Sequence, residues 1–281
     1  MSPALTVWRR FRTNRAALAG AVLVAVTIAG AVLAPLLAAW DPLAMPDPVR
    51  LQGAPPSFAH FLGTDVFSRD VFSRLLFGAR ISLTVGVAAA LAGAALGGGV
   101  GIVAGLGGPL LDAALMRAVD VLLALPRLLL LMAAFALWQR VPLWATVALI
   151  AATGWLETSR LVRAHVKQLR AAEFVTASVA LGGGRRRIAR HLLPHVASTL
   201  VVCASLDVGG IILLEAALAF LGLGTQPPAP SWGNMILEGR PLLFSAPWVA
   251  LAPGVALTAT AVAFNLVGDG LRDALDPRAE R

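Results

Sequence analysis

The stretch ISLTVGVAAALAGAALGGGVGIVAGL, residues 81–106, carries no charged residue. About 20 consecutive apolar residues are enough for an α-helix to cross the hydrocarbon core of a bilayer, so this stretch predicts a membrane-spanning helix. Gly97 and Gly101 within it have the G-x-x-x-G spacing that lets helices pack closely in lipid. Ordinary helix packing explains these glycines, and so does a span that slides or bends as part of a gate.

The rest of the chain has the same apolar character. Of its 281 residues, 58% are hydrophobic and 14% are charged, whereas a soluble domain carries about 25% charged residues. No polar segment is long enough to form a separate soluble domain. We therefore predict an all-α integral membrane protein with six spans, at about residues 16–39, 81–106, 113–137, 141–156, 196–223 and 247–268. The fourth is short and is expected to extend into the polar segment that follows it.

The basic residues predict how these spans are oriented. With a cytoplasmic N-terminus, the inside segments hold 16 Lys and Arg residues and the outside segments hold 6. Because cytoplasmic loops of membrane proteins are enriched in Lys and Arg, both termini are predicted to be cytoplasmic. The net charge of +8 is therefore assigned to membrane topology and not to nucleic-acid binding.

Several kinds of site have no counterpart in the sequence. Cys203 is the only cysteine, and the four histidines are scattered, so we expect no metal site. The single lysine, Lys167, does not lie in a G-x-x-x-x-G-K-[ST] phosphate-binding loop. We expect neither an enzyme active site nor a cofactor bound by this chain.

The most polar long segment is AAEFVTASVALGGGRRRIARHLLPH, residues 171–195. Phe174, Ala177, Ser178 and Leu181 follow i, i+3, i+4, i+7 spacing and would form one small apolar face of a short helix, which Gly182-Gly183-Gly184 would end. Such a helix, held just below the membrane, could dock into a groove of another protein. It could also lie in the membrane interface as an amphipathic helix.

Longer motifs add a resemblance to a known family. Residues 173–182, EFVTASVALG, resemble the E-[YF]-V-E-A-A-x-A-L-G coupling loop of ABC-importer permeases of the dipeptide, oligopeptide and nickel branch. Thr176 and Ser178 replace the usual Glu and Ala. Residues 60–74 resemble the H-x-L-G-T-D-x-x-G-R-D-x-x-S-R entry to the second span, with Ser68 in place of Gly. Residues 221–235 resemble the external loop after the fifth span, and residues 8–42 the first span of the C-type subunit.

This resemblance implies a type I importer architecture and a set of partners. The N-terminal segment, first span and external loop would occupy residues 1–80, and a five-helix permease core with its coupling loop at about 157–195 would occupy residues 81–281. The family pairs such a chain with a homologous B-type permease, two ATP-hydrolysing subunits and an extracytoplasmic solute-binding protein. The residues expected at the ATPase contact are Glu173, Phe174, Thr176, Ala177, Ser178, Leu181, Gly182 and Arg185.

Charged residues inside the predicted spans form a second group of candidates. A charge near the bilayer centre costs about 2.5–3.5 kcal/mol on insertion scales, so Asp207 and Glu215 should face protein or a wet cavity. They could line the pathway and meet a peptide ammonium or a cation. They could also bond to other helices, through Arg127 or Arg117, or be protonated. Arg117 and Asp120 have i, i+3 spacing and are predicted to form an ion pair.

The predicted function is that of a membrane permease subunit that forms half of the path for peptides, nickel chelates or glycosides in the inner membrane. The alternative is a secondary transporter driven by an ion gradient, with Asp207 and Glu215 as coupling groups. In the loop after the fifth span, Gln226, Ser231 and Trp232 are candidate contacts for the binding protein. Trp232 and Trp248 could also be interfacial anchors.

Overall fold

A computed structural model describes residues 3–138, 141–173, 175, 185–226 and 228–275 of the chain. Within these residues the regular structure is helical, and an isolated bridge joins Thr64 to Asp70. The helices are α1 (Pro3–Thr13), α2 (Arg15–Val32), α3 (Ala34–Leu37), α4 (Val71–Leu106), α5 (Pro109–Leu123), α6 (Arg127–Ala136), α7 (Leu143–Arg170), α9 (Arg185–Phe220), α10 (Trp232–Gly239), η1 (Arg240–Leu242) and α11 (Trp248–Leu275).

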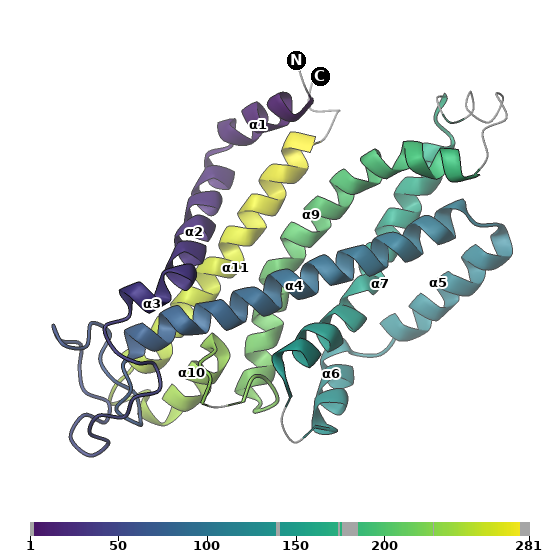
Figure 1. The fold of residues 1–281 in the computed structure, drawn as a ribbon. Helices are drawn as coiled ribbons and strands as arrows, with labels where there is room; N and C mark the ends of the chain where they lie inside the picture. The colour runs from purple at the N-terminus through teal and green to yellow at the C-terminus, as the bar shows by residue number, and fades with distance from the viewer. Residues whose placement is uncertain (1–2, 139–140, 174, 176–184, 227, 276–281) are drawn as a thin grey trace.

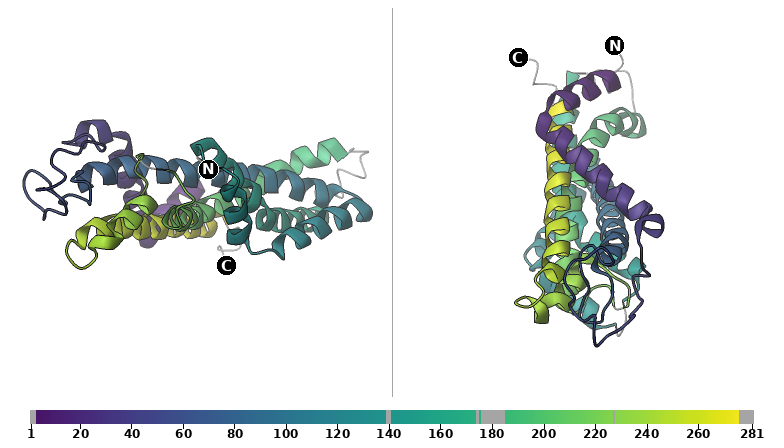
Figure 2. Two further views of the ribbon diagram at one scale, coloured as in Figure 1. Left: turned by 90° about the horizontal axis from the view of Figure 1, so that it is seen from below. Right: turned by 90° about the vertical axis from the view of Figure 1, so that its left-hand side faces the viewer.

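The long helices form an elongated bundle with two distinct ends (Figures 1 and 2). Helix α4 contacts both α7 and α9, and α11 lies between α9 and α2. We call the end that carries α1 and the last turns of α11 the α1 end. The opposite end, which carries the loop of residues 38–70 and α10, is the α10 end.

Four helical stretches are long and apolar enough to cross a membrane: Arg15–Val32, Val71–Leu106, Leu192–Phe220 and Trp248–Leu275. Helices α5 and α6 would together make a fifth span, but they meet at an angle of 77°. The prediction of one continuous helix over residues 113–137 is therefore wrong. The physical cause of the bend between α5 and α6 is Pro126, which cannot donate a helical hydrogen bond and which immediately precedes α6.

Two other helices differ from their predicted lengths. Helix α7 continues to Arg170, which confirms that the short fourth span extends into polar sequence. Because its second half is polar, α7 is not among the helices that are apolar enough to count as membrane spans. Helix α9 begins at Arg185, eleven residues before the predicted start, and Pro194 lies inside it instead of before it.

Helices α4 and α7 approach each other most closely along the glycine-rich stretch. A Cβ atom added to Gly97 would lie 2.6 Å from the carbonyl oxygen of Trp155, and one added to Gly101 would lie 2.7 Å from that of Ser159. Carbon atoms are not tolerated at such distances, so glycine is required for this packing. The contact supports the packing interpretation of the G-x-x-x-G spacing.

A buried ion network organises the α10 end. Arg69 Nε donates to Asp65 Oδ2 at 2.7 Å, and Arg69 Nη2 donates to Glu238 Oε2 at 2.6 Å. Arg74 Nη2 donates to the same Glu238 oxygen at 2.7 Å. Because these residues come from the 38–70 loop region, from α4 and from α10, the network joins three separate segments. Both arginine side chains are at most 2% exposed.

Asp70 begins α4. Its Oδ2 atom accepts a hydrogen bond from the backbone N–H of Ser73 at 2.7 Å, and its Oδ1 atom lies 3.0 Å from His60 Nδ1. A side-chain oxygen at this position satisfies one of the unpaired N–H groups at a helix N-terminus. The R-D-x-x-S motif in the sequence therefore marks the start of α4.

Ser68 adopts a strained conformation beside this network. Its φ angle is +63°, its side chain is fully buried, and its hydroxyl has no hydrogen-bond partner among the described residues. A left-handed backbone conformation costs a residue with a side chain about 1–2 kcal/mol relative to glycine. Glycine adopts this conformation without that cost, which fits the glycine at this point of the motif that residues 60–74 resemble.

We predict that Ser68→Gly stabilises the protein by about 1 kcal/mol, because it removes both the backbone strain and the unpaired buried hydroxyl. The measurement is the thermal unfolding midpoint of the purified chain in detergent, followed by tryptophan fluorescence. Ser245→Gly is the matched control, since Ser245 is exposed and has no positive φ angle. A midpoint that falls in Ser68→Gly as it does in the control would contradict the strain.

We also predict that Gly101→Ala lowers the unfolding midpoint and that Gly99→Ala does not. The added methyl group at Gly101 would collide with Ser159 and Val162 of α7, whereas a Cβ atom at Gly99 has nothing within 4 Å. The two substitutions are chemically identical and lie half a turn apart on α4. Equal unfolding midpoints for both variants would show that α7 does not pack on this face.

Candidate functional site

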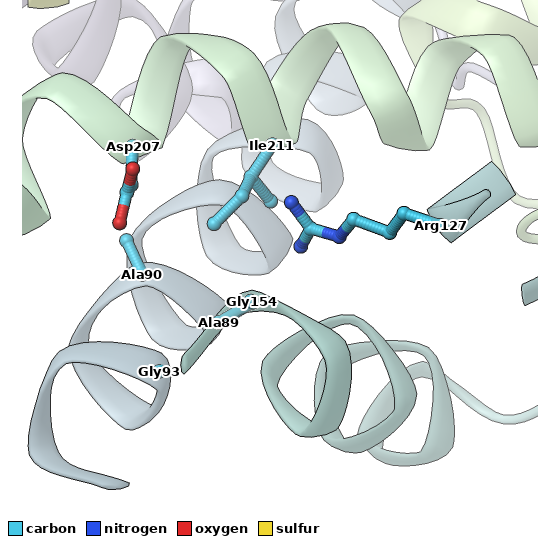
Figure 3. A pocket seen from close by; sticks show the side chains of 7 residues that line it. All are labelled: Ala89, Ala90, Gly93, Arg127, Gly154, Asp207 and Ile211. Atoms are coloured by element: carbon cyan, nitrogen blue, oxygen red, sulfur yellow. The ribbon is translucent and has the colours of Figure 1, made fainter. Parts of the chain in front are cut away.

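Arg127 and Asp207 line one small pocket between the helices (Figure 3). Arg127 is the first residue of α6, and its guanidinium reaches α7, where Nε donates to Thr153 Oγ1 at 3.1 Å and Nη2 donates to the carbonyl oxygen of Ile150 at 3.1 Å. Asp207 enters the pocket from α9. The remaining lining residues are Ala89, Ala90, Gly93, Gly154 and Ile211.

This pocket has a volume of about 10 Å³, which is room for about one water molecule. Asp207 is partly exposed and shares this pocket with the opposite charge of Arg127, which fits the expectation that a carboxylate in a spanning helix faces protein. Arg127 and Asp207 both line the pocket, but the ion pairs found in the described part of the chain do not include one between them.

A much larger cavity lies farther toward the α1 end. It has a volume of about 890 Å³ and lies between α7, α9 and the end of α11. At its edge, a hydrogen bond of 2.8 Å between His165 Nδ1 and Thr199 Oγ1 joins α7 directly to α9. Its lining residues are Leu161, His165, Gln168, Leu169, Ala172, His195, Ser198, Thr199, Val202, Cys203, Leu206, Arg272 and Leu275.

Glu215 lies elsewhere, in the packed contact of α4, α9 and α10. Its side chain is fully buried, and its Oε2 atom accepts a hydrogen bond from Ser82 Oγ at 3.2 Å. Its Oε1 atom has no hydrogen-bond partner among the described residues. This position agrees with the interpretation of Glu215 as a group that bonds between helices, although to Ser82 and not to Arg127 or Arg117.

Ion pairs hold α5 against the second half of α7. Asp112 Oδ2 accepts hydrogen bonds from Arg163 Nη2 at 2.7 Å and from Lys167 Nζ at 2.5 Å. Asp120 pairs with Arg160, also on α7. The predicted ion pair between Arg117 and Asp120 is therefore wrong, because the partner comes from the neighbouring helix and Arg117 is exposed.

Most of the expected ATPase contact lies outside the described residues: Phe174, Thr176, Ala177, Ser178, Leu181 and Gly182. Arg185 is the first residue of α9, and Glu173 is exposed. Val175 is buried in a small cluster with two valines of α7 and two residues of α9. The cluster consists of Val162, Val166, Val175, Leu192 and Val196. It anchors the segment between α7 and α9 to both helices.

The loop residues proposed to meet a binding protein have different environments. Ser231 is fully buried and caps α10 by accepting a hydrogen bond from the backbone N–H of Asn234 at 3.3 Å. Trp232 is 1% exposed, and its Nε1 atom donates to the carbonyl oxygen of Leu75 at 3.1 Å. Direct contact of these two side chains with a partner, and an interfacial role for Trp232, do not fit this burial. Gln226 is partly exposed and donates to the carbonyl oxygen of Gly222.

The sequence named Arg127 as a possible interhelical partner of Asp207, and the structure places both in one pocket. An arginine inside an apolar stretch, such as Arg127, is enough to predict that it meets a buried acidic group. Sequence reasoning missed the network of Asp65, Arg69, Arg74 and Glu238. The ion network joins Glu238 to arginines more than 160 positions away, and the sequence contains no local signal for such a contact. Among the described residues there is no group of three or more His, Cys, Asp or Glu side chains suited to a metal ion.

The chain matches two family models. Residues 97–281 match the inner membrane component of binding-protein-dependent transport systems, and residues 2–56 match the N-terminal membrane domain of oligopeptide transport permease C.

Relatives of known name align over nearly their whole length. A Brucella suis protein with the provisional name of peptide permease is 43% identical over 276 residues, which cover 96% of this chain and 90% of that protein. A dipeptide transport system permease of Alkalihalophilus pseudofirmus is 39% identical over 279 residues, covering 99% of this chain and 91% of that protein.

The helical bundle, its apolar spans and these matches over both parts of the sequence agree with one another. The chain therefore belongs to the ABC-transporter permeases that form the inner membrane component of binding-protein-dependent transport systems, in the C-type branch of the dipeptide and oligopeptide permeases.

Proposed function

We propose that this chain forms half of the translocation path of an ATP-driven importer of peptides or of a related small solute such as a nickel chelate or glycoside. The observation that carries the proposal is the match of nearly the whole chain to relatives named as peptide and dipeptide permeases. A second, homologous B-type permease would supply the other half. An extracytoplasmic binding protein would deliver the solute.

The placement of the basic residues supports a cytoplasmic α1 end. Arg9, Arg10 and Arg12 lie on α1, and Lys167 and Arg170 end α7 near the same side of the bundle. Positive side chains are enriched on the cytoplasmic side of membrane proteins. In this orientation α7, whose first half is apolar, would serve as the sixth span together with α2, α4, the bent α5–α6 pair, α9 and α11.

The coupling role rests on the segment between α7 and α9. Two ATPase subunits would bind at the α1 end, with one receiving Glu173 and the residues that follow it. Val175 would transmit the movement, because it packs against both α7 and α9. ATP and its Mg²⁺ would be bound by the ATPase subunits and not by this chain. An ion-gradient-driven secondary transporter is the alternative, and the family match does not favour it.

The test of the energy source is uptake of radiolabelled Ala-Ala by cells that contain this transporter and no other dipeptide importer. Uptake should stop when the catalytic glutamate of the partner ATPases is replaced by Gln. It should continue in the presence of an uncoupler as long as cellular ATP is maintained. The reverse result, uptake without ATPase activity that collapses with the uncoupler, would establish the secondary transporter instead.

We predict that Val175→Asp abolishes uptake while the chain remains in the membrane. A carboxylate would be placed against Val162 and Val166 and would detach the segment, since burying an unpaired charge is strongly unfavourable. Val49→Asp is the matched control, because Val49 is 88% exposed in the loop at the α10 end. Membrane level is measured by immunoblot and uptake by radiolabel; uptake equal to that of the control would exclude the anchoring role.

We predict separately that Ala177→Trp uncouples ATP hydrolysis from uptake. A bulky side chain on the expected docking face would disturb the fit to the ATPase groove. ATPase activity of the purified transporter should persist without stimulation by the loaded binding protein. Unchanged stimulation and wild-type uptake would remove Ala177 from the contact.

A further inference from the structure

Helix α1 lies just outside the apolar part of the bundle. Asn14 separates it from α2, because the Asn14 side chain caps α2 by accepting a hydrogen bond from the backbone N–H of Ala17 at 3.1 Å. Figures 1 and 2 show α1 turned away from the axis of α2. The 18 residues of α2 cover roughly 27 Å, close to the thickness of the hydrocarbon core of a bilayer. Helix α1 is therefore placed at the level of the lipid headgroups.

One face of α1 is held against the end of α11. Phe11 is 6% exposed and belongs to a buried cluster with Ala17 of α2. A Cβ atom added to Gly270 of α11 would lie 3.2 Å from Phe11 Cε2, so the ring packs closely on the α11 backbone. Arg10 lines a pocket together with Asp273 of α11, and its charge is offset there within the protein. This packing fixes which side of α1 faces outward.

The outward side carries a tryptophan surrounded by positive charge. Trp8 is 55% exposed, and the guanidinium carbon of Arg12 lies 5.9 Å from the centre of its ring. Arg9 on α1 and Arg15 at the start of α2 are also exposed. Among the residues that the structure describes, no carboxylate forms an ion pair with Arg9, Arg12 or Arg15. We call these four residues the outer face of α1.

The chemistry around the outer face fits a lipid with a negative headgroup. The first acidic residue of the chain is Asp41, so positive charge is unopposed along the sequence of both α1 and α2. The face leads onto the exposed apolar side chains of α2, which include Leu18, Val22 and Val26. Tryptophan favours the boundary between headgroups and acyl chains, and arginines on an amphipathic helix attract anionic lipids. Acyl chains would lie beside Trp8 and α2, and the phosphate beside the arginines.

We propose that the outer face of α1 is a binding site for anionic phospholipids in the leaflet at the α1 end. Because Phe11 packs on the last turns of α11, the bound lipid holds the start of the chain and the end of α11 at the same membrane surface. The continuity of the face with the apolar surface of α2 favours lipid over a protein partner. The site is independent of which solute the transporter carries.

The test uses the complete transporter with the photoreactive amino acid p-benzoylphenylalanine in place of Trp8. The transporter is reconstituted in nanodiscs that contain equimolar phosphatidylglycerol and phosphatidylcholine with the same acyl chains. After illumination, mass spectrometry of the α1 segment counts the adducts of each lipid. Because the acyl chains are identical, the adduct ratio measures how strongly the headgroup is selected next to position 8.

We expect about threefold more adducts with phosphatidylglycerol than with phosphatidylcholine. The ratio should fall to about one in the triple variant Arg9→Gln, Arg12→Gln and Arg15→Gln, and should persist when the same three arginines are replaced by Lys. The matched control removes three other exposed arginines, through Arg50→Gln, Arg80→Gln and Arg240→Gln, and should leave the ratio unchanged. About 0.5 M salt should also bring the ratio toward one, because it screens exposed charges.

Three outcomes would overturn the proposal. One is an adduct ratio near one while all three arginines are present. Another is a ratio that stays at threefold in the glutamine variant. The third is predominant cross-linking of position 8 to an ATPase subunit, which would make the outer face a protein contact. If the glutamine variant does not assemble, the salt dependence and the lysine variant decide, since both retain every positive charge on this face.

Discussion

The close packing of α4 against α7 and α9 at its glycines is the contact on which the arrangement of the bundle depends. In lipid, the chain satisfies its backbone by forming helices, but the hydrophobic effect then gives no reason for one helix to associate with another. Close contact must supply that energy, and Gly97 and Gly101 bring the α4 backbone against Trp155 and Ser159. With α4 and α7 fixed, α9 is held against both, since it packs on α4 and a hydrogen bond between His165 and Thr199 joins it to α7.

The charged residues fall into two groups, a buried network at the α10 end and more exposed ion pairs between α5 and α7. At the α10 end, Arg69 and Arg74 are neutralised by Asp65 and Glu238 in a network with almost no exposure, so this end is a rigid structural unit. A buried charge network loses much of its free energy when one partner moves away, which makes large movement within the unit unfavourable. Along α5 and the second half of α7, by contrast, the pairs are more exposed and contribute less to stability. Conformational change is therefore expected away from the α10 end.

The sequence was sufficient to predict apolar helices, the long extension of α7 and membership of the family, because each leaves a local pattern. The bend at Pro126 had a local signal too, since proline interrupts helical hydrogen bonding, but the surrounding apolar residues concealed it in a count of hydrophobicity. The burial of Trp232 and the pairing of Asp120 with Arg160 could not be predicted, because both depend on which helix lies alongside. Ser68 stands between these cases: its replacement of a family glycine was visible, but its cost became clear only from the positive φ angle.

The positions of Asp207 and Glu215 show why the spacing of charges along a helix is a weak guide to function. Eight residues apart on α9, the two would share a broad face of an isolated helix. In the bundle, α10 packs over the later position and encloses Glu215 with Ser82, while Asp207 lies beside a space shared with Arg127. The difference arises from a short helix that the loop sequence places against one end of α9. A carboxylate enclosed by packing stabilises one arrangement, whereas one beside an open space could interact differently with each arrangement of the neighbouring helices.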